Sequence, residues 1–298
     1  MTDERSGRSI EPPSNLTSLR ARLRNHARVV RELETRVQRR LAALVVNEIF
    51  LSVHVGDDGP AVLVKGGTAI DLRRGAAAAR LSKDWDAAVR GNLDDFVAKA
   101  RAALAEGWSG FTGRLAREAE IDVPGLAVKP RRFDVKLDYR GKPFATVPVE
   151  LSPAEGDSGN EHDRISVTEY SAIGLEPLGP VYCLSLRYQI AQKIHACTDP
   201  LDGDTDNDRA RDLVDLQLLA LLLDEAQLDT VRAACVEIFA GRKRHAWPPT
   251  VRIWSAWPAL YAAAIANLGD DVLRDVEAAA DWLRGFIQAI DGGSDGHG

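Results

Sequence analysis

Residues 62–89 decide the fold, and they read VLVKGGTAIDLRRGAAAARLSKDWDAAV. A β-branched run ends at two glycines, a segment from Thr68 to Gly75 fits a short helix with Thr68 as its N-cap, and the final apolar run fits a strand. Successive side chains of a strand point to opposite faces, so Asp84 and Asp86 share one face about 6.5 Å apart. A face that carries two carboxylates cannot be an ordinary hydrophobic core.

The composition is that of a soluble globular protein. The chain has 298 residues, of which 45% are hydrophobic and 28% are charged, enough for one large domain or two modest ones. No apolar run reaches the roughly 18 residues of a membrane span, and the polar start lacks a secretory signal. We therefore expect a cytoplasmic protein with no membrane partner. The widely spaced Cys183, Cys197 and Cys235 form neither a CxxC pair nor a disulfide framework, so we expect reduced, structural thiols.

Charge is distributed unevenly along the chain. The net charge is −6, but residues 1–41 carry ten Arg against five acids, so this segment is +5 and the remainder is −11. A basic helical arm can approach phosphate backbones, as can the basic stretch GRKRHAWPP at 241–249 with its aromatic Trp247. Both stretches are equally consistent with ordinary solvated surface.

The remaining periodicity predicts an α+β fold in which a mixed β-sheet is followed by a helical part. Residues 14–50 fit one long helix with Ser14 as its N-cap, residues 93–107 fit a second helix, and residues 131–152 alternate around RGKP as a β-hairpin. From Leu184 onward the pattern is helical, at about 184–198, 208–223, 225–240, 256–268 and 270–290.

These patterns predict four parts of the chain. They are a basic N-terminal helical segment at 1–50, an α/β domain at 51–180, a helical domain at 181–290 and a flexible tail at 291–298.

The motifs of the opening stretch suit phosphate chemistry. Two carboxylates on one strand face can hold a pair of divalent ions for in-line phosphoryl transfer, and Mg²⁺ suits such an oxygen-rich site. The glycines of GGT at 66–68 let backbone N–H groups approach a phosphate, and a helix that begins there directs its positive end at the anion. Each motif is weak alone, and their order makes the signal fairly specific. The alternative is a turn followed by solvated acids.

The segment KGGTAIDL…RLSKDWD resembles the first motif of the polymerase-beta-like nucleotidyltransferases, especially the AbiEii/AbiGii-type toxins, which include the MenT-type toxins. The stretch LRYQIAQKIHACTDPLDGDTDNDRARDLVDLQLL, residues 186–219, resembles their helical region, with a Lys on one helix and RDxxD opening the next. The resemblance covers roughly residues 60–285. One departure is the sixteen residues between Gly67 and Asp84, which are more than the general superfamily pattern has.

This resemblance implies that Asp84 and Asp86 are catalytic residues that hold Mg²⁺ or Mn²⁺. It also implies a third acid on a partner strand, for which Glu150 is the candidate because its apolar neighbours fall on the opposite face. Asp134 and Asp138, on the other arm of the hairpin, are the rivals. The alternative for all three is surface charge on a half-buried hairpin.

The helical region supplies further candidates by the same resemblance. Lys193 would neutralise triphosphate charge, although spacing alone favours a solvated lysine, and Asp215 would position the ribose, the acceptor hydroxyl or Lys193. Asp212 is the less favoured acid, expected to pair with Arg209 or Arg211. His195 is expected to be a core residue or one that supports the site. The nucleotide-binding candidates are Gly66, Gly67, Thr68, Arg80, Ser82 and Lys193.

The implied function is that of a toxin held in check by an antitoxin protein. Such an enzyme transfers NMP from an NTP to the 3′ end of tRNA, releases pyrophosphate and blocks translation. Two alternatives stay open: a nucleotidyltransferase that modifies a protein or small molecule, and an inactive NTP-binding module. Ser82 is in addition a candidate regulatory phosphorylation site, because a phosphate there would add about −1.5 to −2 charges beside Asp84.

Overall fold

A mixed seven-stranded sheet organises the first half of the molecule. The computed structural model describes residues 10–53, 59–75, 82, 84–122, 128–167, 170–202 and 206–292. Within them the strand order is β3-β4-β5-β2-β1-β7-β6. The strands are β1 Val62–Lys65, β2 Trp85–Val89, β3 Phe111–Glu120, β4 Arg131–Tyr139, β5 Lys142–Pro153, β6 His162–Ile165 and β7 Val181–Leu184. β2 is antiparallel to β1 and parallel to β5, and β1 is parallel to β7.

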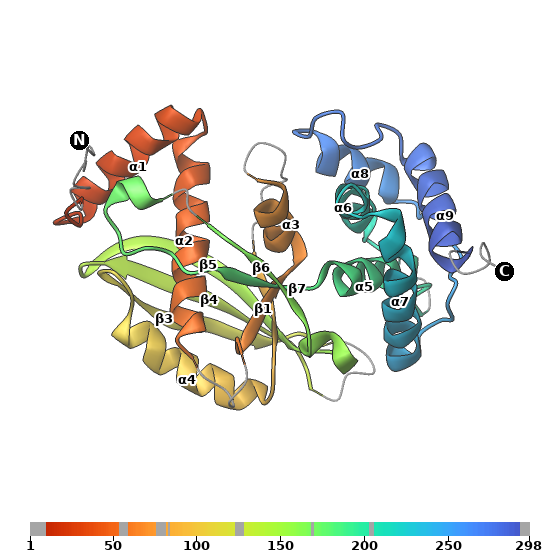
Figure 1. The fold of residues 1–298 in the computed structure, drawn as a ribbon, viewed down its shortest axis with the longest axis horizontal. Helices are drawn as coiled ribbons and strands as arrows, with labels where there is room; N and C mark the ends of the chain where they lie inside the picture. Colours follow the sequence, from red (N-terminus) through yellow and green to blue (C-terminus); the bar gives the residue numbers. More distant parts are fainter. Residues whose placement is uncertain are drawn as a thin grey trace, which may run out of the picture.

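Helices cover the sheet and form the second half of the molecule (Figure 1). They are α1 Leu16–Val30, α2 Glu34–Leu51, α3 Gly66–Arg74, α4 Leu93–Glu106, α5 Leu186–Thr198, α6 Ala210–Ala220, α7 Leu228–Arg242, α8 Trp257–Ile265 and α9 Val276–Gly292. Helices α1, α2 and α4 lie with the sheet, and α5 to α9 pack with one another beyond β7. The structure thereby confirms the expected α+β class.

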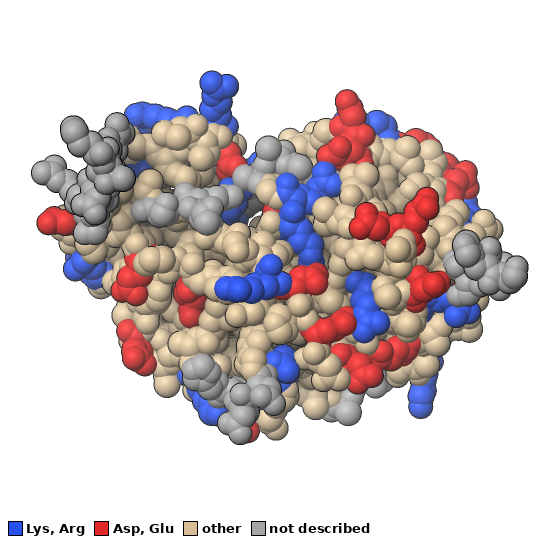
Figure 2. Space-filling view, viewed as in Figure 1, with Lys and Arg blue, Asp and Glu red and all other residues tan. Residues whose placement is uncertain are grey.

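Charge on the face seen in Figure 2 follows this division. Lys and Arg side chains gather in the middle of the face, where the two halves meet, whereas Asp and Glu side chains are frequent on the helical half. The junction is therefore the part of this face that is most suited to an anionic ligand.

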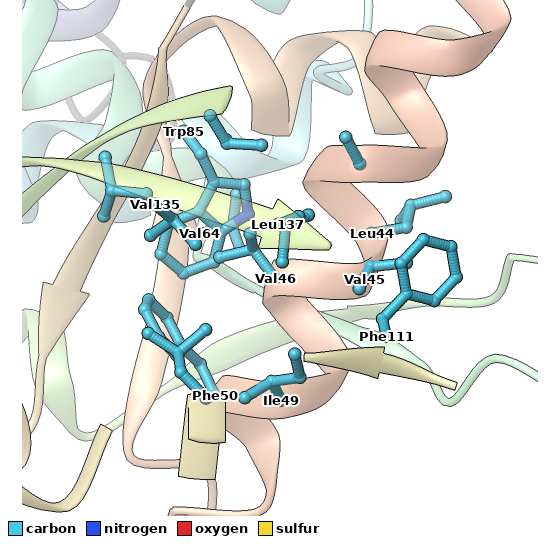
Figure 3. Close-up of a cluster of buried hydrophobic side chains, with 14 of the residues drawn as sticks. Leu44, Val45, Val46, Ile49, Phe50, Val64, Trp85, Phe111, Val135 and Leu137 are labelled. Carbon is cyan, nitrogen blue, oxygen red and sulfur yellow. The ribbon is translucent and has the colours of Figure 1, made fainter. Parts of the chain in front are cut away.

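The central strands are buried on both faces, which explains their short apolar sequences. Val62 and Val64 of β1 point to a core formed with α1, α2 and α4, and Leu63 between them points to a core formed with the C-terminal helices. Figure 3 shows the first of these cores, in which α2 residues face strand residues. Phe50 of α2 is fully buried there, with ring centroids 5.4 Å from Trp85 and 5.5 Å from Phe96 in edge-on contacts.

The expectation of one long N-terminal helix is wrong. The chain forms two helices, because Arg31 adopts a left-handed conformation (φ 56°) and closes α1 by donating its N–H to the carbonyls of Ala27 and Arg28. A helix end without glycine has no clear sequence signal. The expected cap is also displaced, since Asn15 rather than Ser14 caps α1 by accepting from the Ser18 N–H at 2.9 Å.

The hairpin around RGKP is confirmed as β4 and β5, which pair from Tyr139↔Lys142 outward. Edge strand β3 has no counterpart among the sequence predictions. It reads FTGRLAREAE, and its Gly, Ala and Glu are poor strand formers that give no alternating pattern. Pairing with β4 along its length stabilises it instead.

Two further expectations concern thiols and membranes. Cys183, Cys197 and Cys235 are all free and buried, as expected, and burial raises the pKa of Cys183 to about 12. None of the described helices has the length and apolar character needed to cross a bilayer.

Phe50→Ala tests the contribution of α2 to the first core. The cavity left by a fully buried ring should lower the free energy of unfolding by about 3–5 kcal/mol, measured by denaturant titration. Leu33→Ala is the matched control, since Leu33 is 73% exposed, and it should change that free energy by less than about 0.5 kcal/mol. Equal effects of the two variants would contradict the packing described for α2.

Candidate active site

Three acidic residues converge where β2 begins. Asp86 on β2 lies in register with Glu150 on the parallel strand β5 and with Lys65 on the antiparallel strand β1. Neighbouring strands are about 4.8 Å apart and paired residues point to one face, so these side chains share a small area. Asp84 directly precedes β2. The structure thus brings Asp84, Asp86 and Glu150 together.

The pKa of Asp86 reports this crowding. Burial and the nearby Glu150 carboxylate raise it to about 6, with a further contribution from Asp84, while Lys65 and Lys193 act in the opposite direction. Like charges held at such distances resist simultaneous ionisation. A divalent cation would relieve this repulsion, so the donor set fits a hard metal ion.

The rival acids on β4 lie further away. Asp134 is opposite Pro148 and interacts with Arg117 and Lys136, each at 3.5 Å, and Asp138 is opposite Pro143 towards the hairpin turn. The β4 residue opposite Glu150 is Arg132, whose guanidinium lies 3.0 Å from the Glu150 carboxylate. At the level of Asp86, β4 therefore presents a cation.

The GGT motif forms the first turn of α3 against these acids. Gly66 has a positive φ of 64°, and a Cβ at this position would collide with the Asp86 carboxylate. Gly67 is buried in the same turn. Thr68 is not the N-cap that the sequence predicted, because α3 already begins at Gly66; its hydroxyl instead donates to the Asp84 carbonyl at 3.0 Å.

Ser82 lies on the other side of the same carbonyl group. Its hydroxyl donates to the Asp84 carbonyl at 2.9 Å, and its N–H donates to the Asp71 carboxylate of α3 at 3.0 Å. Thr68 and Ser82 therefore both hold the backbone from which the Asp84 side chain extends. Arg80, the remaining nucleotide-binding candidate of this stretch, lies outside the described residues.

The helical half contributes a buried ionic trio. The Lys193 ammonium on α5 donates to Asp212 at 2.6 Å and to Asp215 at 2.8 Å, both on α6. Burial alone would lower the pKa of Lys193, but the two carboxylates outweigh it and raise that pKa. Lys193 is thus neither solvated nor a free cation, and one of its three N–H donors is left for a ligand.

The expected ion pair between Asp212 and Arg209 is present, but Lys193 is the closer partner of Asp212. Asp212 contacts Lys193 closely, while the Arg209 guanidinium is 3.9 Å away. Spacing placed Asp212 and Asp215 on one helix face, which is correct, but spacing could not show that one lysine lies between them. Asp215 was expected to position the ribose, the acceptor hydroxyl or Lys193, and the structure shows its contact with Lys193.

Three charged residues near the acids were not predicted from the sequence. Lys65 donates to the Ser152 hydroxyl at 2.6 Å, and burial lowers its pKa against the opposing effects of Glu155 and Asp86. Arg242 pairs with Glu155 through two hydrogen bonds of 2.7 and 2.8 Å. The position of Lys65 directly before the two glycines could have identified it as a residue close to the site. Arg242 belongs to the basic stretch 241–249, but its guanidinium faces inward.

Hydrogen bonds tie the GGT turn to the helical half. Gln189 of α5 is 2% exposed and donates to the Gly66 carbonyl at 2.8 Å. Arg73 of α3 donates to the Gln189 side chain, to Asp163 at 2.6 Å and to the Leu184 carbonyl at 2.6 Å. These contacts fix the position of α5, and so of Lys193, relative to the acids.

A second group of possible ligands lies away from this site, where His195, Asp199 and His245 place donor atoms within 4.8 Å of one another. Burial lowers the pKa of His195 to about 3, so its ring is neutral. Arg242, which can only donate, lies 3.2 Å from His195 Nδ1, so the proton of that ring is on Nε2. While Arg242 donates to Nδ1, the Nε2 atom carries the ring proton and has no lone pair for a metal, so a metal ion at this group would require Arg242 to move away.

Gly66→Ala should disrupt the site. The new Cβ would displace the Asp86 carboxylate and strain a positive φ, so we expect the free energy of unfolding to fall by about 2–4 kcal/mol and metal binding to weaken at least tenfold. Calorimetric titration with Mg²⁺ or Mn²⁺ measures the binding. Gly141→Ala is the matched control, because Gly141 has a similar φ of 73° but open space around it. Equal loss of binding in both variants would refute the role of Gly66.

The raised pKa of Asp86 predicts a pH dependence of stability. The folded protein holds this proton more tightly than the unfolded chain, whose Asp pKa is about 3.9. The stability linked to Asp86 is therefore full below pH 4 and falls as the pH rises to about 6. In metal-free buffer at pH 7.5, Asp86→Asn should raise the free energy of unfolding by about 1–3 kcal/mol. Asp138→Asn should leave it unchanged, and a destabilised Asp86→Asn protein would contradict the prediction.

Comparisons with known proteins agree with this geometry. A family model described as nucleotidyl transferase AbiEii toxin, type IV TA system, matches residues 51–285. Among solved structures, the chain is similar to MenT4, a nucleotidyltransferase toxin from Mycobacterium tuberculosis H37Rv. The two share 19% sequence identity with a TM-score of 0.50, and the alignment covers 92% of this chain and 98% of that chain. No curated protein matches.

The family match covers most of the chain and includes the GGT turn, the converging acids and the ionic trio. It confirms the resemblance drawn from KGGTAIDL…RLSKDWD and establishes the chain as a nucleotidyltransferase. The likeness to MenT4, at its low identity, supports the fold alone. The chain therefore belongs to the AbiEii family of nucleotidyltransferase toxins of type IV toxin–antitoxin systems.

Proposed function

We propose that this nucleotidyltransferase transfers NMP from an NTP to the 3′ end of tRNA in a Mg²⁺-dependent reaction. The observation that carries the proposal is the convergence of Asp84, Asp86 and Glu150 beside the glycine turn that begins α3. In the reaction, a bond forms between the acceptor oxygen and the α-phosphorus, the bond from that phosphorus to the pyrophosphate oxygen breaks, and the hydroxyl proton passes to water.

Asp84, Asp86 and Glu150 are the residues that would hold Mg²⁺ or Mn²⁺. The bound metal would neutralise negative charge on the phosphates and on the attacking oxygen. The protein supplies the fixed carboxylates. Arg132 holds Glu150 from β4, Lys65 lies opposite Asp86 on β1, and Thr68 and Ser82 hold the backbone of Asp84.

The triphosphate would lie between the first turn of α3 and the helical half. The backbone N–H groups of Gly66, Gly67 and Thr68 have no helical partner there, and the N-terminal end of α3 favours anions. Lys193 lies across the junction with one donor left. Its positive charge is already balanced by Asp212 and Asp215. We therefore propose that Lys193 orients one phosphate oxygen and does not neutralise the charge of the triphosphate.

An RNA acceptor accords with the charge of the molecule. Lys and Arg gather at the junction of the two halves on the face of Figure 2, and residues 1–41 carry a net charge of +5. Such surfaces attract a phosphate backbone. Membership in a toxin–antitoxin family implies an antitoxin partner, and a tRNA substrate would place both proteins in the cytoplasm.

Phosphorylation of Ser82 is the regulation that we propose for this site. The Ser82 hydroxyl lies 2.9 Å from the Asp84 carbonyl, so a phosphate there would stand at the carboxylates and repel the triphosphate. The antitoxin would then act by modifying the toxin rather than by covering it.

Incubation of the purified protein with total tRNA, Mg²⁺ and each α-labelled NTP in turn tests the reaction. Label should enter RNA from one or two nucleotides and should fall at least a hundredfold in Asp84→Ala, because removing a metal carboxylate removes charge stabilisation of the transition state. In the same assay Ser82→Asp should be strongly impaired, whereas Ser82→Ala should retain most activity. Full activity of Ser82→Asp would contradict the regulatory proposal.

The location of the label separates the alternatives. Label that resists RNase and follows a polypeptide or a small molecule would favour that acceptor class over tRNA. No label, together with Mg-NTP binding in calorimetry, would exclude total tRNA as the source of the acceptor. Failure to bind Mg-NTP would favour a binding module whose cleft is inactive.

A further inference from the structure

A cavity of about 600 Å³ opens beside Asp84, on the α2 side of the sheet. Thr68, Ser82 and Asp84 are among its lining residues, so it borders the GGT turn and the start of β2 in the site described above. Its walls are largely apolar and come from α2, α3, β2, β5 and the segments around β6 and β7. They include Ala43, Leu44, Leu72, Trp85, Val147, Ile165, Val167 and Val181.

Six polar side chains of α2 also line this cavity, and three of them, Arg36, Arg39 and Asn47, bear on its ligand. Asn47 is 1% exposed, and no described donor reaches its side-chain oxygen. A buried amide oxygen without a donor is costly in an apolar setting. Arg39 and Arg36 line the cavity about two and three helical turns before Asn47, and neither has a carboxylate partner among the described residues.

This combination fits one nucleotide. Apolar walls accept the faces of a base, an amide can pair with the donor and acceptor atoms on a base edge, and unpaired guanidinium groups bind phosphate. The volume lies within the usual range for small-molecule sites. An apolar ligand would leave Asn47 and the arginines unused.

We propose that this cavity receives the terminal nucleotide of the acceptor strand, an inference that rests on the proposed function. In an in-line displacement the attacking and leaving oxygens lie on opposite sides of the phosphorus. The triphosphate is assigned to the side of the helical half, where Lys193 lies. The acceptor must then approach from the opposite side of Asp84, which is where the cavity opens.

The trinucleotide CCA, which reproduces the 3′ end of tRNA, is the probe. Its dissociation constant is measured by calorimetry in the presence of Mg²⁺ for the full chain and for Ala43→Phe, Asn47→Leu and Arg36→Glu. Ala43→Phe places a ring in the cavity, Asn47→Leu removes the amide at similar volume, and Arg36→Glu reverses a charge at its wall. Each should weaken CCA binding at least tenfold, while the dissociation constant of Mg-NTP changes less than twofold.

Matched controls exclude general effects of the substitutions. Ala262→Phe places the same ring on the exposed surface of α8, and Lys142→Glu makes the same charge change at the exposed β4–β5 turn. Both should bind CCA as the unaltered protein does, and thermal unfolding verifies that all variants fold. Unchanged CCA binding in Ala43→Phe and Asn47→Leu would overturn the proposal. Parallel loss of Mg-NTP binding would also overturn it, because the cavity would then belong to the NTP.

Failure of this inference can be told apart from failure of the proposed function. If label is transferred to tRNA but the cavity variants bind CCA as tightly as the unaltered protein does, the proposed reaction would stand and the role of the cavity would be refuted. CCA binding that depends on Ala43 and Asn47, without transfer to any RNA, would support the cavity and refute the reaction.

Discussion

The repulsion between carboxylates held on adjacent strands is the constraint on which the rest of the site depends. The register of β2 and β5 places Asp86 beside Glu150, and burial, together with this proximity, raises the pKa of Asp86. Every neighbouring feature is arranged around that charge. Gly66 leaves room for the Asp86 carboxylate, Lys65 lies opposite it, and Arg132 holds Glu150. The sheet thus retains an arrangement that costs stability and suits a metal ion.

Local patterns in the sequence were sufficient for the elements that carry the site. The order of strand, glycine turn, short helix and Asp-x-Asp strand predicted β1, α3 and β2, and alternation predicted the β4–β5 hairpin. The face of Glu150 also followed from its apolar neighbours. These predictions succeeded because each depends on residues close together in the chain, whose periodicity reflects which side is buried.

Features that depend on distant residues could not be predicted in this way. Nothing in the spacing shows that Lys193 is buried between Asp212 and Asp215, that Arg242 turns inward to Glu155, or that Gln189 contacts Gly66. Each of these contacts is formed by packing between segments far apart in sequence. Strand β3 was missed for a related reason, since pairing with β4 rather than intrinsic propensity stabilises it.

The ionic trio of Lys193, Asp212 and Asp215 also restricts how this sequence can evolve. Removing one member of such a buried group leaves a charge without compensation, at a cost of about 3–5 kcal/mol, whereas replacing the whole group with apolar residues can be neutral. A lineage can therefore abandon these residues together, or keep them together, but it cannot easily exchange them one at a time. Substitutions at the three positions should be correlated among descendants of this chain, even where the toxin has lost its target.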